Sequence, residues 1–407
     1  MGLYLSSKYK KNFNTNYSFG PDILIIFFKT VFLLIKSLLF NSNYSIYINL
    51  VKVVHLKKND LAFYNLKSIV KKASFYFRNT FISYISAGYS YFTSKTLLTD
   101  LFLFNLNSET SIMKTIKKED LNQAIFDLYD AYAHNKIERR QFVEKLSVFA
   151  VGSLTVPTLL SFMMPNYKDN LLVQPNDPRI DSDYINYDSP KGGGVIKGLF
   201  SKPSNAKKIL PGVIVVHENR GLNPYIEDVG RRTAVAGFIS LAPDALSPLG
   251  GYPGNDDEGR EMQKKRSRTE MLEDFIAAYD YLIKHENCNG KVGVVGFCFG
   301  GWISNQMAVK LPNLAAAVPF YGGQPTEEEA AQIKTPLLLH YAGLDERVNA
   351  GWPNYEKVLK ANKVEYTAHI YPDVNHGFHN NTTPRYDDSA ANLAWERTLS
   401  FFRDKLL

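Results

Sequence analysis

The chain has very few cysteines, with only Cys288 and Cys298 among its 407 residues. Two cysteines exclude the disulfide scaffold that holds many small secreted domains together. A bridge between these two is also disfavoured, because a strand separates its ends by roughly 3.3 Å per residue. The absence of a C-x-x-C pair argues against a thiol redox protein. We therefore expect free thiols.

Other absences narrow the function further. The formal net charge is +7, but no arginine-rich stripe alternates with aromatic residues, and no nucleic-acid-binding motif is present. The excess charge lies mainly in lysine-rich patches near residues 8–11 and 114–118. The histidines, including His217, His340, His369 and His379, are not spaced as metal ligands. We expect no nucleic-acid partner, no metal and no cofactor.

Residues 1–112 are nearly free of glycine, proline and glutamate and show no steady helical or strand period. The apolar run at residues 23–40 is long enough to suggest a membrane span, but Lys29 and Lys36 interrupt it. A charge near the centre of a membrane helix costs about 2.5–3.5 kcal/mol on insertion scales. We interpret residues 1–112 as an extension that is disordered or not translated, with the natural chain beginning near Met113. A membrane span is the alternative.

Residues 113–167 form a leader of different character. Residues 118–134 carry apolar side chains at a helical spacing. The motif I-E-R-R-Q-F-V-E-K-L at 137–146, followed by an uncharged stretch to Tyr167, resembles a twin-arginine export signal. Glu144 and the lack of an A-x-A cleavage site depart from that pattern. The prediction is export or membrane anchoring on the periplasmic side. The alternative is a cytoplasmic protein in which this leader folds as a helix ending in a buried apolar hairpin.

Residues 168–407 alternate between strand and helix patterns. Short apolar runs that favour strands lie at 213–217, 238–242, 291–295, 336–341 and 365–371. Helical patterns lie at 225–236, 268–285, 301–311, 352–362 and 388–405. This alternation predicts an α/β domain with a mostly parallel sheet. Residues 176–189 are polar and turn-rich, and we interpret them as a linker that leads into this domain.

Reactive residues follow four of the predicted strands: Glu218, Cys298, Asp345 and His376. In parallel sheets, ligands bind at the carboxyl ends of the strands. The sequence G-F-C-F-G at 296–300 has the glycine spacing of a nucleophile elbow, with cysteine in place of serine. Each residue alone also fits a purely structural role: Cys298 as a core residue, Asp345 as a turn cap and His376 as a loop residue. Their order of nucleophile, acid and histidine favours a catalytic triad.

The stretch from about residue 212 to 407 resembles the dienelactone hydrolase family. The matching pieces are H-E-N-R-G-L at 217–222, A-G-F-I-S-L-A-P-D at 236–244, G-F-C-F-G-G at 296–301, Y-A-G-L-D at 341–345 and N-H-G-F at 375–378. The resemblance implies an α/β-hydrolase fold, with a mostly parallel central sheet and helices on both faces. The preceding segment is expected to be largely helical or disordered.

The resemblance also implies roles for individual residues. Cys298 would be the nucleophile, His376 its base, Asp345 the acid that orients the histidine, and Glu218 a carboxylate that interacts with the resting thiol. The oxyanion hole would be formed by the backbone N–H groups of Phe299 and Asn219. The expected reaction is hydrolysis of a small carboxylic ester or lactone through a thioester intermediate.

The resemblance does not specify dienelactone as the substrate. Dienelactone hydrolases proper hold the substrate carboxylate with arginines, one of them just after the catalytic histidine, where this chain has Asn380. Arg260, Arg266 and Arg268 lie in the region of the other arginine. A different ester, lactone or thioester remains open. A second class of function also remains open, namely a non-catalytic, membrane-tethered binding module built on the α/β-hydrolase fold.

Overall fold

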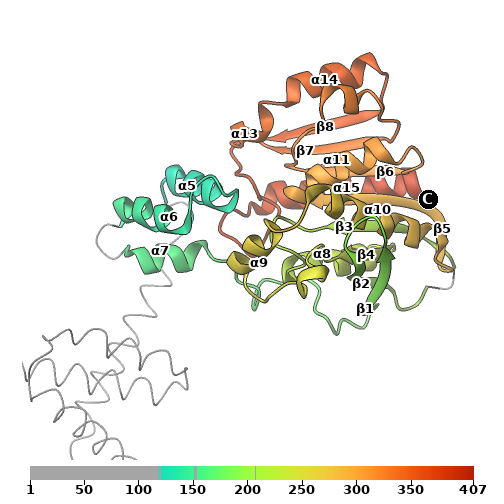
Figure 1. Ribbon diagram of the computed structural model, residues 1–407, viewed down its shortest axis with the longest axis horizontal. Helices are drawn as coiled ribbons and strands as arrows, with labels where there is room; N and C mark the ends of the chain where they lie inside the picture. The colour runs from blue at the N-terminus through green and yellow to red at the C-terminus, as the bar shows by residue number, and fades with distance from the viewer. Residues whose placement is uncertain (1–117, 119–120, 151–153, 207) are drawn as a thin grey trace, which may run out of the picture. The chain divides into compact units, whose positions relative to one another are not determined.

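The structure is a computed structural model that describes residue 118 and residues 121–150, 154–206 and 208–407. The expected extension at 1–112, including the apolar run at 23–40, lies outside the described residues. Residues 100–407 belong to one compact unit, and Figure 1 shows the arrangement of its labelled elements.

The described part of this unit contains an eight-stranded sheet with the order β1-β2-β4-β3-β5-β6-β7-β8. The strands are β1 (Ile180–Ser189), β2 (Gly194–Pro203), β3 (Leu210–Val216), β4 (Ile239–Pro243), β5 (Cys288–Phe297), β6 (Ala316–Phe320), β7 (Leu337–Ala342) and β8 (Tyr366–Tyr371). Strands β3 to β8 pair in parallel, whereas β1 and β2 are antiparallel to their neighbours. The carboxyl ends of the parallel strands therefore lie along one edge.

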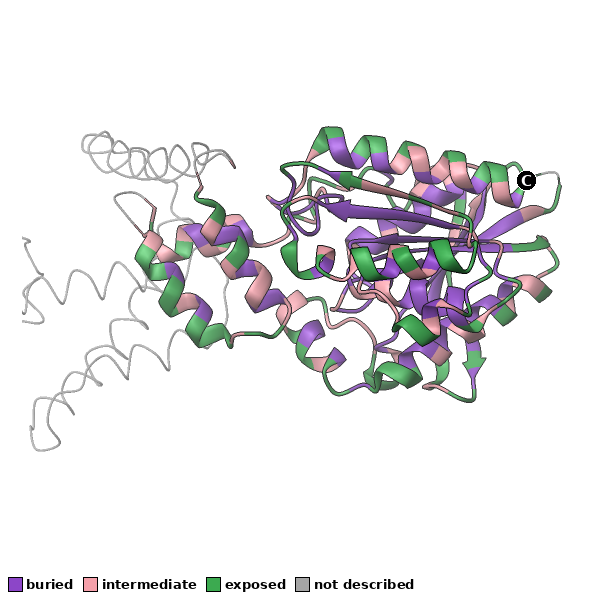
Figure 2. Ribbon diagram, turned by 90° about the horizontal axis from the view of Figure 1, so that it is seen from above, coloured by how far each residue is buried: buried purple, intermediate pink, exposed green. Residues whose placement is uncertain are grey.

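Helices cover both faces of the sheet and bury it between two apolar layers (Figure 2). Helices α10 (Arg268–Lys284), α11 (Phe299–Lys310) and α14 (Trp352–Ala361) contribute to one layer. Helices α8 (Pro224–Val235) and α15 (Asp388–Leu406) contribute to the other. Shorter elements connect them: η4 (Ser247–Leu249), α9 (Asp256–Gln263), α12 (Glu327–Ala330) and α13 (Glu346–Asn349). The predicted α/β-hydrolase architecture is confirmed.

The segment interpreted as a linker is a strand in the structure. Most of the stretch at 176–189, interpreted as a linker, is the edge strand β1. It pairs with β2 alone and keeps many polar side chains in solvent, so it lacks the continuous apolar run of a central strand. An edge strand pairs with one neighbour only and can carry polar side chains in solvent. Its sequence therefore resembles that of a turn-rich linker.

The leader contains three α-helices among its described residues: α5 (Gln123–Ala133), α6 (Arg139–Leu146) and α7 (Val156–Met163), with a single turn η3 (Ser147–Phe149). They share an apolar cluster that includes Phe126, Tyr132, Phe142 and Leu159. This shows that the described part of the leader contains helices with a buried apolar side. We call these elements the N-terminal helices.

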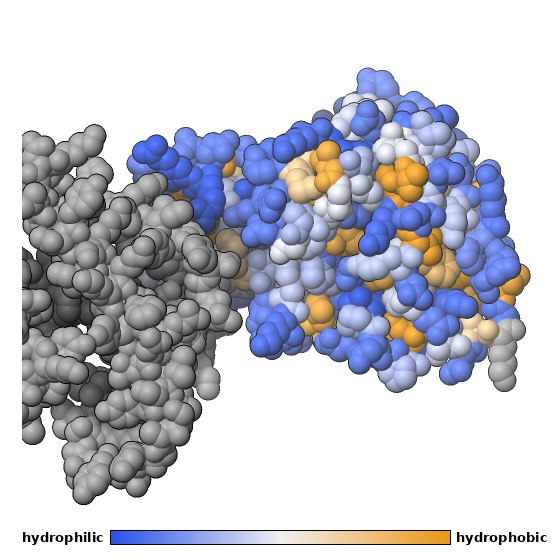
Figure 3. Space-filling view, turned by 60° about the horizontal axis from the view of Figure 1, so that its bottom comes forward, coloured by the Kyte–Doolittle hydropathy of each residue, from blue (hydrophilic) through white to orange (hydrophobic). Residues whose placement is uncertain are grey.

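The surface of the described residues carries few large apolar side chains. Figure 3 shows a mostly hydrophilic face on which apolar residues occur in small separate groups. Among the helices that the structure describes, none is both long and apolar enough to cross a membrane.

Candidate active site

Cys298 occupies a strained turn between β5 and α11. Its φ of 57° and ψ of −110° are unusual for a non-glycine residue. The turn is tight enough that a Cβ on Gly296 would overlap the carbonyl of Gly300, and one on Gly300 would overlap that of Val216. The glycines of the predicted elbow are therefore needed for space, and they allow Cys298 to lie at the start of α11.

Asp345 and His376 lie at the same edge of the sheet and are joined to each other. Asp345 caps α13 just after β7, and His376 lies in the loop after β8. Nδ1 of His376 is 2.6 Å from Oδ2 of Asp345, and both side chains are buried. This contact fixes the ring and leaves its Nε2 without a hydrogen-bond partner among the described residues. That nitrogen is the one available for proton transfer.

A residue outside the predicted triad makes the closest contact with the thiol. His134 caps the C-terminal end of α5, and its Nε2 lies 3.2 Å from Sγ of Cys298. The His134 and His376 rings pack edge-to-face with their centroids 4.6 Å apart. Residues 118–134 predict the helix that ends here, but they carry no signal that it reaches Cys298.

Charged residues surround the two histidines. Nδ1 of His134 lies 2.9 Å from the carbonyl oxygen of Asp130 and 3.1 Å from its Oδ1. Arg347 Nη2 lies 3.2 Å from His134 Nε2 and 3.2 Å from His376 Nδ1. The same guanidinium is 3.5 Å from Asp130 and 3.8 Å from Asp345. The carboxylates therefore compensate the positive charge that gathers at the thiol.

These charges shift the protonation of the site. Burial alone would raise the pKa of Cys298, but the neighbouring His134 and His376 hold it well below its usual range. Burial would lower the pKa of His376, but Asp345 and Cys298 outweigh it and raise that pKa to about 10. His134 also has a raised pKa, because Cys298 and Asp130 outweigh the effect of its burial. A thiolate beside imidazolium groups is the favoured resting state.

The remaining predicted site residues lie close to the elbow in the fold. Phe299 is the first residue of α11, where backbone N–H groups have no partner within the helix. Asn219 follows β3, and its side chain donates to the carbonyl of Ala133 in α5. Glu218 is buried and accepts a hydrogen bond from Asn380, Nδ2 to Oε2, at 3.0 Å. Asn380 therefore has a structural partner.

The three arginines considered for substrate binding have different surroundings. Arg266 forms a buried ion pair with Asp274 at 2.6 Å, so it is already neutralised. Arg260 lies over the ring of Tyr132, 3.9 Å from its centroid. Arg268 lies 4.0 Å from the ring centroid of Trp302, and its pKa is lowered by burial while the Cys298 thiolate opposes that effect. Arg268 therefore has a favourable charge interaction with the Cys298 thiolate.

Polar groups join the N-terminal segment to the hydrolase domain. Arg260 Nη1 donates to the carbonyl of Tyr132 in α5 at 3.2 Å, and Lys118 Nζ, which precedes the N-terminal helices, donates to the carbonyl of Tyr386 at 2.9 Å. A cavity of about 440 Å³ lies at this junction, lined by residues such as Tyr132, Asn135 and Arg260. Because the thiol of Cys298 is beneath α5 and only 8% of the residue is exposed, the helices limit access to it.

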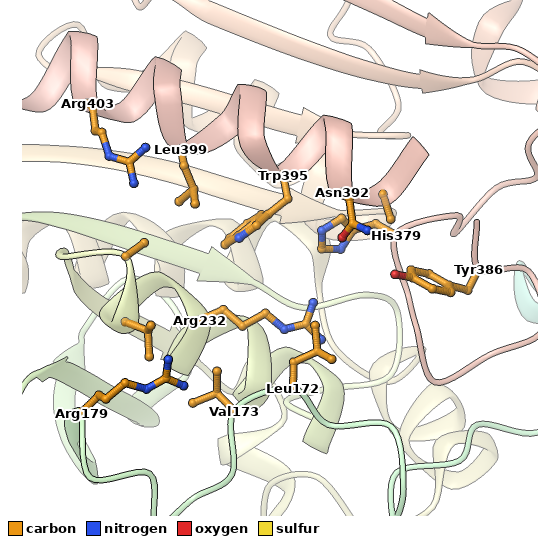
Figure 4. A pocket seen from close by; sticks show the side chains of 13 residues that line it. Leu172, Val173, Arg179, Arg232, His379, Tyr386, Asn392, Trp395, Leu399 and Arg403 are labelled. Carbon is orange, nitrogen blue, oxygen red and sulfur yellow. The ribbon is translucent and has the colours of Figure 1, made fainter. Parts of the chain in front are cut away.

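A second cavity, of about 410 Å³, lies between α8 and α15 (Figure 4). His379, Trp395, Arg232 and Arg403 line it, whereas Cys298 does not. His379 is buried, and its Nδ1 is hydrogen-bonded to the hydroxyl of Tyr225 at 2.7 Å. We therefore interpret it as a structural residue. This cavity is separate from the thiol.

Sequence spacing predicts no cluster of metal ligands, and the structure differs. One ligand atom from each of His134, Cys298 and His376 lies within 4.8 Å of the others. Residues separated by more than a hundred positions come together here because α5 packs across the sheet edge, which no local pattern encodes.

Known proteins resemble both parts of this arrangement. The sequence model of the dienelactone hydrolase family matches residues 196–406, and a YqhI-like family model matches residues 113–151. A "putative carboxymethylenebutenolidase" of Saccharolobus solfataricus is 31% identical over 257 residues, covering 54% of this chain and 97% of that protein. A "putative hydrolase fragment YghX" of Escherichia coli is 54% identical over 112 residues, 28% of this chain and 96% of the fragment.

A solved structure shares the fold of the hydrolase part. A dienelactone hydrolase-like promiscuous phosphotriesterase from metagenomic libraries aligns with a TM-score of 0.50 at 23% identity, covering 56% of this chain and all of that one (100%). The fold and site together define an α/β-hydrolase. The chain belongs to the dienelactone hydrolase family.

Proposed function

We propose that this hydrolase cleaves a small carboxylic ester or lactone with Cys298 as its nucleophile. The observation that carries the proposal is the position of Cys298 in a strained elbow beside an aspartate-held histidine, His376. A thiolate in that position is already deprotonated, so attack needs no separate activation step.

In the proposed reaction, Sγ of Cys298 attacks the carbonyl carbon. The N–H groups of Phe299 and Asn219 would stabilise the oxyanion. Collapse breaks the carbon–oxygen bond, and the imidazolium of His376 gives its proton to the departing alkoxide. Neutral His376 then takes a proton from water, which attacks the thioester; the carbon–sulfur bond breaks, and the acid is released together with the Cys298 thiolate beside the imidazolium of His376. Asp345 holds the ring in place through both steps.

Hydrolysis of p-nitrophenyl acetate by purified protein tests this proposal. We expect Cys298→Ala to lose the activity of the wild type, while Cys288→Ala, which changes the other thiol, keeps it. Equal rates in wild type and Cys298→Ala would remove Cys298 as the nucleophile. A panel of lactones, esters and thioesters on the wild type would then define the substrate, and no turnover of any of them would favour a non-catalytic binding module.

The location of the chain is a separate proposal. The paired arginines, Arg139 and Arg140, open helix α6, and the uncharged segment after them supports export or anchoring at the periplasmic side. Cell fractionation tests it, and an entirely cytosolic pool would contradict it.

A further inference from the structure

We infer that His134, Cys298 and His376 form a binding site for a zinc ion, which joins α5 to the hydrolase domain. This goes beyond the proposed hydrolysis and does not depend on it. The three ligand atoms lie within 4.8 Å of one another. Ligands around tetrahedral zinc are roughly 3.3–3.6 Å apart, given Zn–N and Zn–S bonds of about 2.0–2.3 Å. The contact between His134 Nε2 and Sγ is already 3.2 Å.

The ring nitrogens are oriented as metal-binding histidines require. His376 directs Nδ1 toward the carboxylate of Asp345 at 2.6 Å, and His134 directs Nδ1 toward the backbone carbonyl of Asp130 at 2.9 Å, with the Asp130 carboxylate oxygen Oδ1 3.1 Å away. A carboxylate or a backbone carbonyl on one nitrogen fixes the tautomer and makes the other nitrogen a better metal ligand. His376 Nε2 is buried without a hydrogen-bond partner among the described residues, so it is available for that role.

The ligand types favour zinc over magnesium and calcium. Thiolate and imidazole are soft or borderline ligands, which disfavours magnesium and calcium. Three protein ligands of nitrogen and sulfur, with a fourth position left for water, match an open zinc site. Binding would release the protons that the histidines carry at Nε2 in the resting site.

Arg347 is a cationic group that directly contacts a proposed ligand atom and opposes the ion. Its Nη2 lies 3.2 Å from the same His134 nitrogen. Its side chain is 31% exposed, so the guanidinium has room to turn into solvent. The thiolate and the carboxylates of Asp130 and Asp345 remain to neutralise the two positive charges of zinc. The inference therefore makes an unusual prediction: removing the charge of Arg347 should strengthen zinc binding.

The test uses the full chain, freed of metal and titrated with Zn²⁺ against a chromophoric zinc chelator, without substrate. We expect one ion per chain and at least tenfold weaker binding in His134→Ala and in Cys298→Ser. The matched controls His285→Ala and Cys288→Ser should bind as the wild type does. Arg347→Gln should bind more tightly than the wild type.

Two further measurements keep the test decisive. Co²⁺ in place of Zn²⁺ should produce a thiolate-to-metal charge-transfer absorption that Cys298→Ser lacks. If that variant does not fold, as judged by circular dichroism, Asp130→Asn serves instead, with an expected loss of about 10- to 100-fold in affinity. Absence of the absorption in the wild type, or equal zinc affinity in His134→Ala and His285→Ala, would overturn the inference. Hydrolysis is assayed separately with zinc chelated, so failure of one proposal leaves the other standing.

Discussion

His134 Nε2 lies 3.2 Å from Sγ of Cys298, although 164 positions separate the two residues in the chain. The contact joins the segment that matches the YqhI-like family model to the segment that matches the dienelactone hydrolase family. It covers the thiol, supplies positive charge that favours the thiolate, and brings a third potential metal ligand to Cys298 and His376. Helix α5 therefore contributes a residue to the candidate site.

The two cysteines should differ in reactivity at mildly acidic pH. The pKa of Cys298 is held well below its usual range, whereas burial raises that of Cys288. Only a thiolate alkylates rapidly. At pH 6, iodoacetamide should therefore modify Cys298 many times faster than Cys288, as measured by peptide mass spectrometry. Both cysteines reacting only above pH 8 would contradict the shifted pKa of Cys298.

The pH dependence of hydrolysis should be flat over a wide range. The thiolate exists above the lowered pKa of Cys298, and the imidazolium exists below the raised pKa of His376, about 10. The ion pair of Cys298 thiolate and His376 imidazolium therefore exists at pH values between these two pKa values. We expect kcat/KM for an unactivated ester to be constant through neutral pH and to fall toward pH 10. An activity that rises with pH through about 8.5 would indicate an ordinary thiol instead.

Asp345→Asn should slow hydrolysis strongly while the fold is kept. Asp345 accepts from His376 Nδ1 at 2.6 Å and from Val348 N at 3.2 Å, and an asparagine keeps the shape without the charge. Loss of the carboxylate destabilises the imidazolium and permits the wrong tautomer, so kcat should fall by roughly 10²–10⁴-fold. Steady-state kinetics measure the loss, with circular dichroism as the folding control. A change of less than threefold would remove Asp345 from the triad.

Gly300→Ala should destabilise the elbow. A Cβ at this position would overlap the backbone carbonyl of Val216, which cannot move without disturbing β3. We expect the free energy of unfolding to fall by about 1–3 kcal/mol or more. Gly323→Ala is the matched control, because the nearest atom, in Trp302, would be 3.7 Å from the new methyl group. Chemical denaturation compares the two, and similar stabilities would show that the elbow tolerates a Cβ.

Removing residues up to Met164 should uncover the thiol without unfolding the hydrolase domain. The N-terminal helices have an apolar cluster of their own, and many of their contacts with the domain are polar. Tyr167 must stay, because its hydroxyl donates to Asp256 at 2.8 Å. The shortened chain should keep a cooperative thermal transition, and its Cys298 should react faster with a bulky maleimide than that of the full chain. Unchanged labelling would show that the helices do not restrict access.

Local sequence was sufficient for much of the hydrolase domain. Continuous apolar runs specify β3 and β5, because a strand buried on both faces cannot carry polar side chains. The glycines around Cys298 specify the elbow, because its turn leaves no space for a Cβ at these positions. Strands β1, β2 and β6 were not predicted. Strand β6 is a short alanine-rich run that resembles a turn of helix, the edge strand β1 is too polar to resemble a buried strand, and β2 mixes exposed and buried residues and has no continuous apolar run.

The triad order could also be inferred from sequence, since each residue follows its own strand and parallel strands end at one edge. The place of His134 could not. Helix α5 has an apolar side that predicts burial, but amphipathicity does not say which surface will receive the helix. The sequence alone determined a sheet that gathers Cys298, Asp345 and His376. Only the tertiary structure decided that His134 joins them. Its contact with Cys298 depends on how helix α5 packs against the hydrolase domain, and no local sequence pattern specifies that packing.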